Sequence, residues 1–333
     1  MRMNDTLTAI AGVLVGHAQD ETGLTGCTAI LFEQRNAVSA ALSTGGLPGT
    51  YNIGAALQAW EGVKCDGIFF AGGSLYGLDA ATGVRKFIEE QLRPPPTKRS
   101  ADPLSLLRGI VTGAVIFDLQ VGSSQARPDA EMGYAASANA SRDPVLQGNV
   151  GAGCGATVGK FLGLKQAMKG GIGSICLVTQ HGARVGALVA VNAVGNVFDT
   201  ERGCTIAGAR RTERTGFLEF AEIIEKGPPP PSQAGQNTVL GVIVTDVLLD
   251  PPHLAKMAQA GHLGVARAVR PAQTSFDGDT FFAVTTAKHS AQIATAALSS
   301  DMVMHFASEA VRLAILRAVL AARSVGGIPG VAG

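Results

Sequence analysis

The chain has 333 residues, 46% of them hydrophobic and only 5% aromatic, so it can bury a large core built from small aliphatic side chains. Its formal charge is +1, from 27 Lys and Arg against 26 Asp and Glu, which provides no basic surface for nucleic acid or an anionic membrane. Its five cysteines include no CxxC pair, which argues against both a disulfide framework and a zinc site. We expect reduced, mostly buried thiols and no cofactor.

The chain ends give no membrane or export signal. Residues 1–6 lack the apolar core of a signal peptide, and the most apolar later segment, 302–322, contains Glu309, Arg312 and Arg317. We therefore expect a cytoplasmic protein with no membrane partner.

The first apolar runs predict short strands at 12–17, 26–32 and 37–42. His17, at the end of the first strand, is a candidate catalytic base. A single histidine at a strand end is more often structural, so both interpretations stay open.

Residues 66–71 predict a strand that ends in the glycine-rich loop 72–77, followed by a helix to about residue 92. The spacing fits neither GxGxxG nor GxxxxGK[ST], and Ser74 does not fit GxSxG. The loop is therefore expected to pack the helix on the sheet or to line a substrate pocket.

Residues 113–118 predict a buried strand that ends on a carboxylate, and 128–133 open a helix of small residues. Asp129 and Glu131 could hold a substrate amine. Helix capping by Asp129 is the simpler interpretation.

Four glycines surround one basic residue in 151–160, a composition that brings the backbone close to another group. No nucleotide-fold spacing follows, so Lys160 is of more interest than the glycines. Burial would lower the pKa of its amine and make it available for proton transfer, whereas an ordinary surface lysine would stay charged. Asn192, which ends a predicted strand at 185–191, could supply an oxyanion donor or simply form a turn.

Residues 235–245 form the segment on which the functional interpretation depends. The proline-rich stretch 227–235 predicts an exposed connector, and the apolar run 239–244 predicts a strand buried on both faces. If the Thr238 hydroxyl cleaves the Asn237-Thr238 bond, Thr238 acquires a free α-amine beside its own hydroxyl. That amine, with a reference pKa of about 7.7–8.0, can accept the hydroxyl proton. Taken locally, the same residues also fit an ordinary turn before a strand.

The last third predicts a helix capped by Asp250, a strand at 280–286 and a terminal helix at 299–322. Asp277 and Asp279 flank a glycine just before the strand. Two carboxylates are too few ligands for a metal site of their own, so we expect them to position Thr238.

Several segments, in order along nearly the whole chain, share one pattern: Gly16-His17 with Leu24 to Thr28, Ala71 to Ser74 with Gly77 to Ala81, Gly113 to Asp118, Val150 to Gly153 with Gly159-Lys160, Asn237-Thr238, and Asp277 to Thr280. Together they resemble the DmpA-type aminopeptidases. This resemblance implies an α/β fold, a four-layer α/β/β/α sandwich like that of N-terminal nucleophile hydrolases, with the chain topology of ornithine acetyltransferases.

The resemblance also implies roles for individual residues. Thr238 would be the nucleophile, Asn192 the oxyanion donor, Lys160 a base or polar partner, and Asp277 with Asp279 the groups that position Thr238. Self-cleavage between Asn237 and Thr238 would divide one catalytic domain, 1–333, into an α chain, 1–237, and a β chain, 238–333. Family members usually form tetramers of αβ units, so a homo-oligomer is implied too.

The expected function is hydrolysis of small peptides or amides through an acyl-Thr238 intermediate. The nylon-oligomer hydrolases are similar in their Thr and Asp-Gly-Asp pattern, but they carry a tyrosine where this chain has Phe117. Some peptidase members have Ser as nucleophile with a Ser-Gly-Glu pair. Three alternatives therefore stay open: a 6-aminohexanoate-oligomer endohydrolase, an acyltransferase of the ornithine acetyltransferase type, and an uncleaved, non-catalytic homologue.

Overall fold

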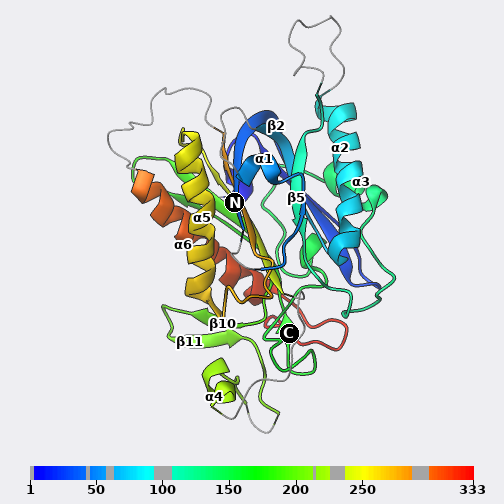
Figure 1. Cartoon of the computed structure of the whole chain (residues 1–333), viewed down its shortest axis with the longest axis vertical. Coiled ribbons are helices and arrows are strands. Elements are labelled where there is room, and N and C mark those ends of the chain that lie inside the picture. Colours follow the sequence, from blue (N-terminus) through cyan, green and yellow to red (C-terminus); the bar gives the residue numbers. More distant parts are fainter. Residues whose placement is uncertain are drawn as a thin grey trace, which may run out of the picture.

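A computed structural model describes residues 4–42, 46–57, 64–93, 107–212, 215–225, 237–286 and 300–333 (Figure 1). The connector predicted at 227–235 lies outside these residues, as does the proline-rich end of the helix predicted after the 72–77 loop.

One hydrogen-bonded sheet runs through the described part of the chain. Its strands, in spatial order, are β3 (Gly49–Tyr51), β5 (Val111–Val115), β4 (Lys64–Ala71), β2 (Thr25–Leu42), β14 (Thr280–Thr285), β12 (Thr238–Thr245), β9 (Arg184–Asn192) and β8 (Gly171–Val178), with β1 (Val13–Asp20) also paired to β2. Most neighbours are antiparallel, but β12 with β14 and β4 with β5 are parallel. The first strand of the proposed second chain, β12, is therefore an interior strand.

Strand β2 joins the two halves of this sheet. Its first part pairs with β1 and β4, its second part pairs with β14, and the β2–β4 register shifts between Leu31 and Asn36. The strand curves over between the halves (Figure 1). The prediction of separate strands at 26–32 and 37–42 is therefore wrong, since both belong to one continuous strand.

The two halves of the sheet face one another across an aliphatic core. Side chains alternate along a strand, and Leu240, Val242 and Val244 of β12 belong to the same buried cluster as Phe70 of β4. Phe282 of β14 lies with its ring 6.3 Å from that of Phe70. This alternation makes β12 buried on both faces, as its apolar run predicts.

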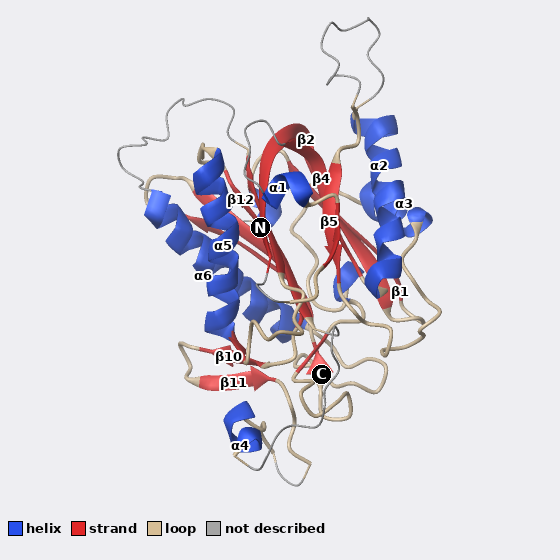
Figure 2. Cartoon of the chain, in the orientation of Figure 1, coloured by secondary structure: helices blue, strands red, loops and turns tan. Residues whose placement is uncertain are grey.

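Helices cover the two outer faces. The alternate β12 residues Val239 and Ile243 pack in a second cluster with α5 (Pro251–Ala268) and α6 (Ser300–Ala321). A third cluster joins α2 (Ala80–Phe87) and α3 (Ala130–Ala138) to β4 and β5. Figure 2 shows the strands lying between these two helix pairs. The layers are helix, sheet, sheet and helix, which confirms the predicted α/β/β/α architecture.

Local capping rules account for the helix starts. Asp129 accepts from Met132 N at 2.9 Å and Asp250 accepts from His253 N at 2.9 Å, which confirms both as N-caps. The smaller elements are η1 (Leu7–Ala9), α1 (Gly54–Leu57), η2 (Ser74–Asp79), η3 (Ile88–Leu92), η5 (Gly151–Gly153), β6 (Thr157–Val158), β7 (Met168–Lys169), β10 (Asn196–Asp199), β11 (Cys204–Ala207), α4 (Phe220–Ile224) and β13 (Val269–Arg270).

All five thiols are free and every one but that of Cys204 is buried, as predicted. Among the described helices, none combines the length and the apolarity that a bilayer crossing requires.

Candidate active site

Thr238 begins β12 and lies on the inner face of the sheet. Thr238 is two residues before Leu240, so its side chain points to the same inner face of β12. Its Cα pairs with that of Asn192, which ends β9 and points to the same inner face as Leu188. Thr238 is 5% exposed and Asn192 fully buried. The ends of two antiparallel strands thus bring the predicted nucleophile and the predicted oxyanion donor together between the sheet halves.

The Thr238 hydroxyl lies against the carbonyl that precedes it. Its Oγ1 donates to Asn237 O at 2.5 Å, and Gly278 N donates to the same oxygen at 2.9 Å. A parallel bridge between Asn237 and Asp277 holds the two segments in this register. The hydroxyl therefore lies beside the carbonyl group of its own preceding peptide, and the carbonyl oxygen already accepts a backbone N–H.

Position 278 has no room for a Cβ, because the Thr238 hydroxyl and the Leu47 carbonyl lie too close. A Cβ at this position would lie 2.8 Å from Thr238 Oγ1 and 2.9 Å from Leu47 O. The glycine between the two aspartates therefore leaves the space that the hydroxyl occupies.

Asp279 holds the backbone just after Thr238, and Asp277 holds the backbone of its own loop. Asp279 Oδ1 accepts from Val239 N at 2.7 Å, and Asp277 Oδ2 accepts from Thr274 N at 2.7 Å. Asp277 Oδ1 is buried with no hydrogen-bond partner in the described part of the chain. It can therefore accept from a further donor, such as the α-ammonium group that cleavage before Thr238 would create. Burial raises the pKa of both carboxyls, that of Asp279 to about 7 with a further contribution from the charge of Asp277.

Lys160 and Asn192 form a buried pair. Lys160 Nζ donates to Asn192 Oδ1 at 2.7 Å and to Asn192 O at 3.1 Å, while Asn192 Nδ2 donates to Phe117 O at 3.0 Å. Thr157 N also donates to Asn192 Oδ1, at 3.1 Å, so the orientation of the amide is fixed. Lys160 is 3% exposed, which excludes the solvated surface lysine.

The environment of Lys160 prepares its amine for proton transfer. Burial lowers its pKa to about 7, although the charges of Asp277 and Asp118 oppose this shift. Near neutral pH a large fraction of the amine is therefore unprotonated.

Position 117 contributes its backbone to the site. The Phe117 carbonyl accepts from Asn192 Nδ2, so this hydrogen bond depends on the position of the backbone and not on a phenolic side chain. Sequence reasoning missed this carbonyl and the backbone amides of Thr157 and Thr274. Side-chain patterns carry no signal for such groups, because tertiary packing alone brings them to the site.

The other candidate residues have structural contacts. His17 Nδ1 lies 2.9 Å from Thr28 Oγ1, and burial lowers its pKa to about 4. Ser74 lies in η2, where its N–H donates to Ile116 O at 2.9 Å. The glycine-rich loops pack against protein: a Cβ at Gly72 or Gly155 would collide with the buried Asp118 carboxylate.

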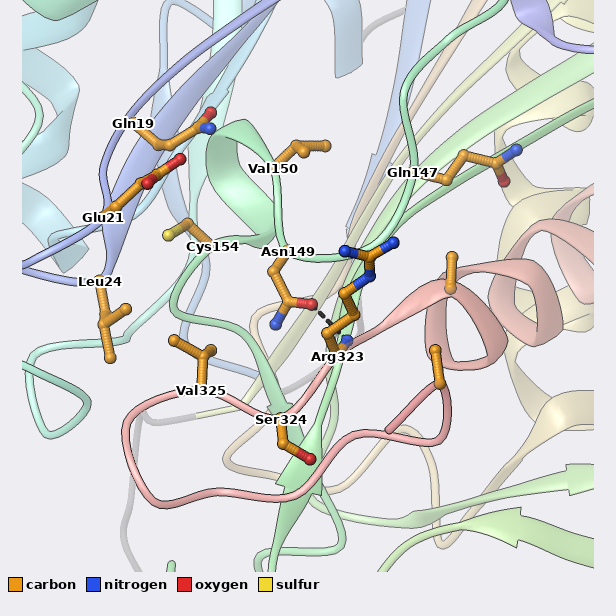
Figure 3. Close-up of a pocket in the computed structure, with 12 residues that line it drawn as sticks. Gln19, Glu21, Leu24, Gln147, Asn149, Val150, Cys154, Arg323, Ser324 and Val325 are labelled. Carbon is orange, nitrogen blue, oxygen red and sulfur yellow. Dashed lines mark hydrogen bonds between the residues drawn. The ribbon is translucent and has the colours of Figure 1, made fainter.

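A cavity of about 770 Å³ lies between the β1–β2 turn, the 147–154 segment and the chain after α6 (Figure 3). Glu21 and Arg323 are its charged lining residues, and Asn149 Oδ1 accepts from Arg323 N at 2.6 Å. Thr238 is not among the residues that line it. Across the described ranges, no three His, Cys, Asp or Glu side chains gather as a metal site would require.

Solved structures share this fold. The L-aminopeptidase D-Ala-esterase/amidase from Ochrobactrum anthropi, described as a variant of the Ntn hydrolase fold, aligns with a TM-score of 0.71 at 21% identity over 98% of this chain and 88% of its own. A Burkholderia sp. beta-aminopeptidase aligns with a TM-score of 0.68 at 20% identity, over 98% and 90%.

The fold and the sequence matches define an amide-bond hydrolase. The sequence matches Peptidase family S58 over residues 5–332. The chain belongs to this family, which confirms the predicted resemblance to the DmpA-type enzymes.

Curated relatives cover most of the chain. A Mycobacterium leprae protein described as an uncharacterized aminopeptidase is 35% identical over 98% of this chain and 92% of its own length. A 6-aminohexanoate-oligomer endohydrolase from Kocuria sp. is 33% identical over 83% of this chain and 73% of its own length.

Proposed function

We propose that the chain cleaves itself between Asn237 and Thr238 and then acts as an aminopeptidase or amidase on small peptides or amides. The observation that supports this most directly is the Thr238 hydroxyl, held 2.5 Å from the carbonyl oxygen of its own preceding peptide. The buried Lys160 and Asp277 provide the polar groups that such chemistry needs nearby.

Self-cleavage would proceed as an N-to-O acyl shift. Thr238 Oγ1 attacks the Asn237 carbonyl carbon, the C–N bond breaks, and the nitrogen takes up the hydroxyl proton and becomes the α-amine. Gly278 N–H, already bonded to the carbonyl oxygen, stabilises the negative charge of the tetrahedral intermediate. Water then hydrolyses the ester, which leaves an Asn237 carboxylate and a free Thr238.

Turnover would use the same atoms again. The neutral α-amine accepts the Thr238 hydroxyl proton as the oxygen attacks a substrate amide. The resulting ammonium then donates that proton to the nitrogen of the leaving amine as the substrate C–N bond breaks. The buried amide of Asn192 supports the oxyanion, and Asp277 Oδ1 accepts from the new ammonium group. Water releases the acid from the acyl-Thr238 ester.

The relatives suggest two substrate classes. Aminopeptidase-named relatives span nearly the whole chain, which favours short peptides with a free amine. The Kocuria relative supports 6-aminohexanoate oligomers as the second candidate. Acyl transfer to an amine would differ only in the acceptor. A homotetramer of cleaved units and a cytoplasmic location stay predictions.

The test is the intact mass of purified Thr238→Ala, Thr238→Ser and parent protein, together with turnover of aminoacyl nitroanilides and 6-aminohexanoate oligomers. We expect the parent and Thr238→Ser to give fragments 1–237 and 238–333, because both keep a hydroxyl. Thr238→Ala should stay whole and inactive. Cleavage or turnover by Thr238→Ala would refute the assignment, and product transfer to added amino acids would identify an acyltransferase.

A further inference from the structure

A line of hydrogen bonds continues from Asp279 away from Thr238. Asp279 Oδ2 accepts from Gln273 Nε2 at 3.1 Å, and the same nitrogen lies 2.8 Å from His262 Nδ1. His262 belongs to α5 and packs edge-on against Phe281 of β14, with ring centroids 5.1 Å apart. The carboxylate beside the proposed nucleophile is therefore connected to the outer helix layer through one amide.

The backbone of Gln273 is unusual. Its φ is +58°, in the left-handed region that favours glycine, and the residue is not a glycine. A turn alone would be served better by glycine at this position. The disfavoured backbone places the Gln273 side chain between Asp279 and His262, which indicates that the side chain has a role of its own.

The orientation of this amide follows from its two neighbours. Burial lowers the pKa of His262, against the opposing effect of the Ala41 backbone, so the imidazole is neutral near pH 7. Its Nδ1 then accepts one Gln273 N–H, and an ionised Asp279 accepts the other. The flipped amide would turn its oxygen toward the carboxylate, so His262 and Asp279 together select the orientation that donates to both.

We infer that Gln273 and His262 are positioning residues for the proposed reaction: Gln273 holds the Asp279 carboxylate against Val239 N–H, and His262 acts through Gln273 by fixing its amide. This inference rests on the proposed function of Thr238 and extends it, because Val239 N–H is the next backbone group after the nucleophile. Without the Gln273 donor, the Asp279 carboxylate would be held at Val239 N–H only, and the backbone at the start of β12 would be less firmly positioned.

The same contacts control the charge of Asp279. The groups around it are Asp277 in its own loop, Val239 N–H from β12, and Gln273 with His262 behind it on α5. Burial and the Asp277 charge raise the pKa of Asp279, while Val239 and Gln273 lower it. Loss of Gln273 should therefore raise this pKa further and leave more Asp279 protonated near neutral pH.

The test compares Gln273→Gly, His262→Phe and the double variant with the parent. Gln273→Gly relaxes the left-handed backbone and removes the amide, so we expect kcat to fall about tenfold or more, as for one lost bond to a charged group. The acid limb of its pH profile should move to higher pH. His262→Phe keeps the ring packing and should have a smaller effect, and the double variant should be no worse than Gln273→Gly, since His262 acts through it.

His305→Phe is the matched control, because His305 also packs edge-on against a phenylalanine, Phe306, but is exposed on α6. It should leave kcat and the pH profile unchanged. Additive effects of Gln273→Gly and His262→Phe, or an unchanged acid limb in Gln273→Gly, would overturn the inference.

A second readout does not depend on activity. In the Thr238→Ala background, thermal unfolding is followed from pH 4 to 9 with and without Gln273→Gly, so that the difference between the two curves reports the ionisation of Asp279. The raised folded pKa of Asp279 makes its contribution to stability fall as pH rises toward that value. Gln273→Gly should extend this fall to higher pH. If the parent proves uncleaved but the shift is found, the proposed function fails and the inference on Asp279 stands; an unchanged curve overturns the inference.

Discussion

Burial of the Lys160 amine should lower the stability of the folded protein, while it makes the amine a better proton acceptor near neutral pH. Its pKa falls from 10.5 in the unfolded chain to about 7 in the folded protein, so the folded state binds fewer protons between these values. Stability should therefore rise with pH from about 7 to 10.5, by about 1.4 kcal/mol for each pKa unit at most. Below pH 7 the full penalty of burying the charge is present.

We expect Lys160→Met to flatten this rise and to be more stable than the parent at pH 7, while cleavage at Asn237-Thr238 slows at least tenfold, or about 1.4 kcal/mol in the barrier. Thermal unfolding from pH 6 to 10 measures the first effect and intact mass over time the second. Lys165→Met provides the control, since Lys165 lies in the same segment but its side chain is exposed. Equal pH slopes in parent and Lys160→Met would contradict the prediction.

The contact between Gly278 and the Thr238 hydroxyl gives a steric prediction. A methyl group at 278 must displace either Thr238 Oγ1 or the Leu47 carbonyl, so Gly278→Ala should slow cleavage by about tenfold or more for a displacement near 1 Å. Pulse-chase electrophoresis measures the rate. Gly54→Ala is the control, because a Cβ there meets nothing within 4 Å. A Gly278→Ala protein that cleaves at the parent rate would show that the hydroxyl does not need this space.

Local sequence features are enough to select some of these residues. Thr238 lies where a proline-rich stretch meets an apolar run, and Asp277 and Asp279 flank a glycine just before a strand. Gln273 and His262 have no such signal, because a glutamine after a helix and a histidine within one are ordinary. Only the packing of α5 on β14 brings them to Asp279.

At the scale of elements, a buried cation ties α6 to the turn between β10 and β11. Arg312 is 1% exposed; its guanidinium donates to Glu309 in the same helix and to Glu201 Oε1 at 2.6 Å. Removing an acid leaves the buried charge poorly paired, so Glu309→Leu should lower the free energy of unfolding by about 1–3 kcal/mol. Urea unfolding monitored by circular dichroism measures this change.

Replacing both members of the pair tests the reason. Arg312→Met with Glu309→Leu should recover most of the loss and lie within about 1 kcal/mol of the parent, because the uncompensated charge is gone. The surface pair formed by Arg85 of α2 and Glu89 of η3 is the control, and its double replacement should change stability by about 0.5 kcal/mol or less. A double α6 variant less stable than Glu309→Leu would mean that the ion pair itself stabilises the helix.

Strand β2 indicates where element prediction from sequence fails. Residues 33–36 are polar and interrupt two apolar runs, so the sequence predicts two separate strands. In the structure Arg35 donates to both oxygens of the buried Asp66 in β4, at 3.0 and 2.9 Å. A carboxylate thirty-one positions away satisfies the polar residue within the strand, and a local pattern cannot contain that information.

For the whole molecule, composition predicts a large aliphatic core but not its division into layers. The alternation along β12, with Leu240 toward one cluster and Val239 toward another, requires two separate cores, which an uninterrupted apolar run cannot distinguish from one. The four layers were predictable only from the combined motifs that resemble a known family. Their order in the chain carries the topology that single-strand patterns lack.

This division into layers determines what the proposed cleavage before Thr238 would do to the particle. Strand β12 of the second fragment lies between β9 and β14, and β14 pairs in turn with β2 of the first fragment. Helix α6 of the second fragment covers β8 and β9 of the first, and α5 of the second fragment packs on β2 of the first. The fragments therefore share both large cores, as the partners in an obligate complex share a divided domain core.

We expect the cleaved protein to elute as one particle in native size-exclusion chromatography and to separate into 1–237 and 238–333 only under denaturing conditions. Its thermal unfolding should be one cooperative transition, because the two largest buried clusters are each built from both fragments. Uncleaved Thr238→Ala should elute at the same volume, since cutting one bond before β12 leaves the packing unchanged. Release of 238–333 in native buffer, or two separate transitions in calorimetry, would show that the fragments fold independently and that β12 does not join them.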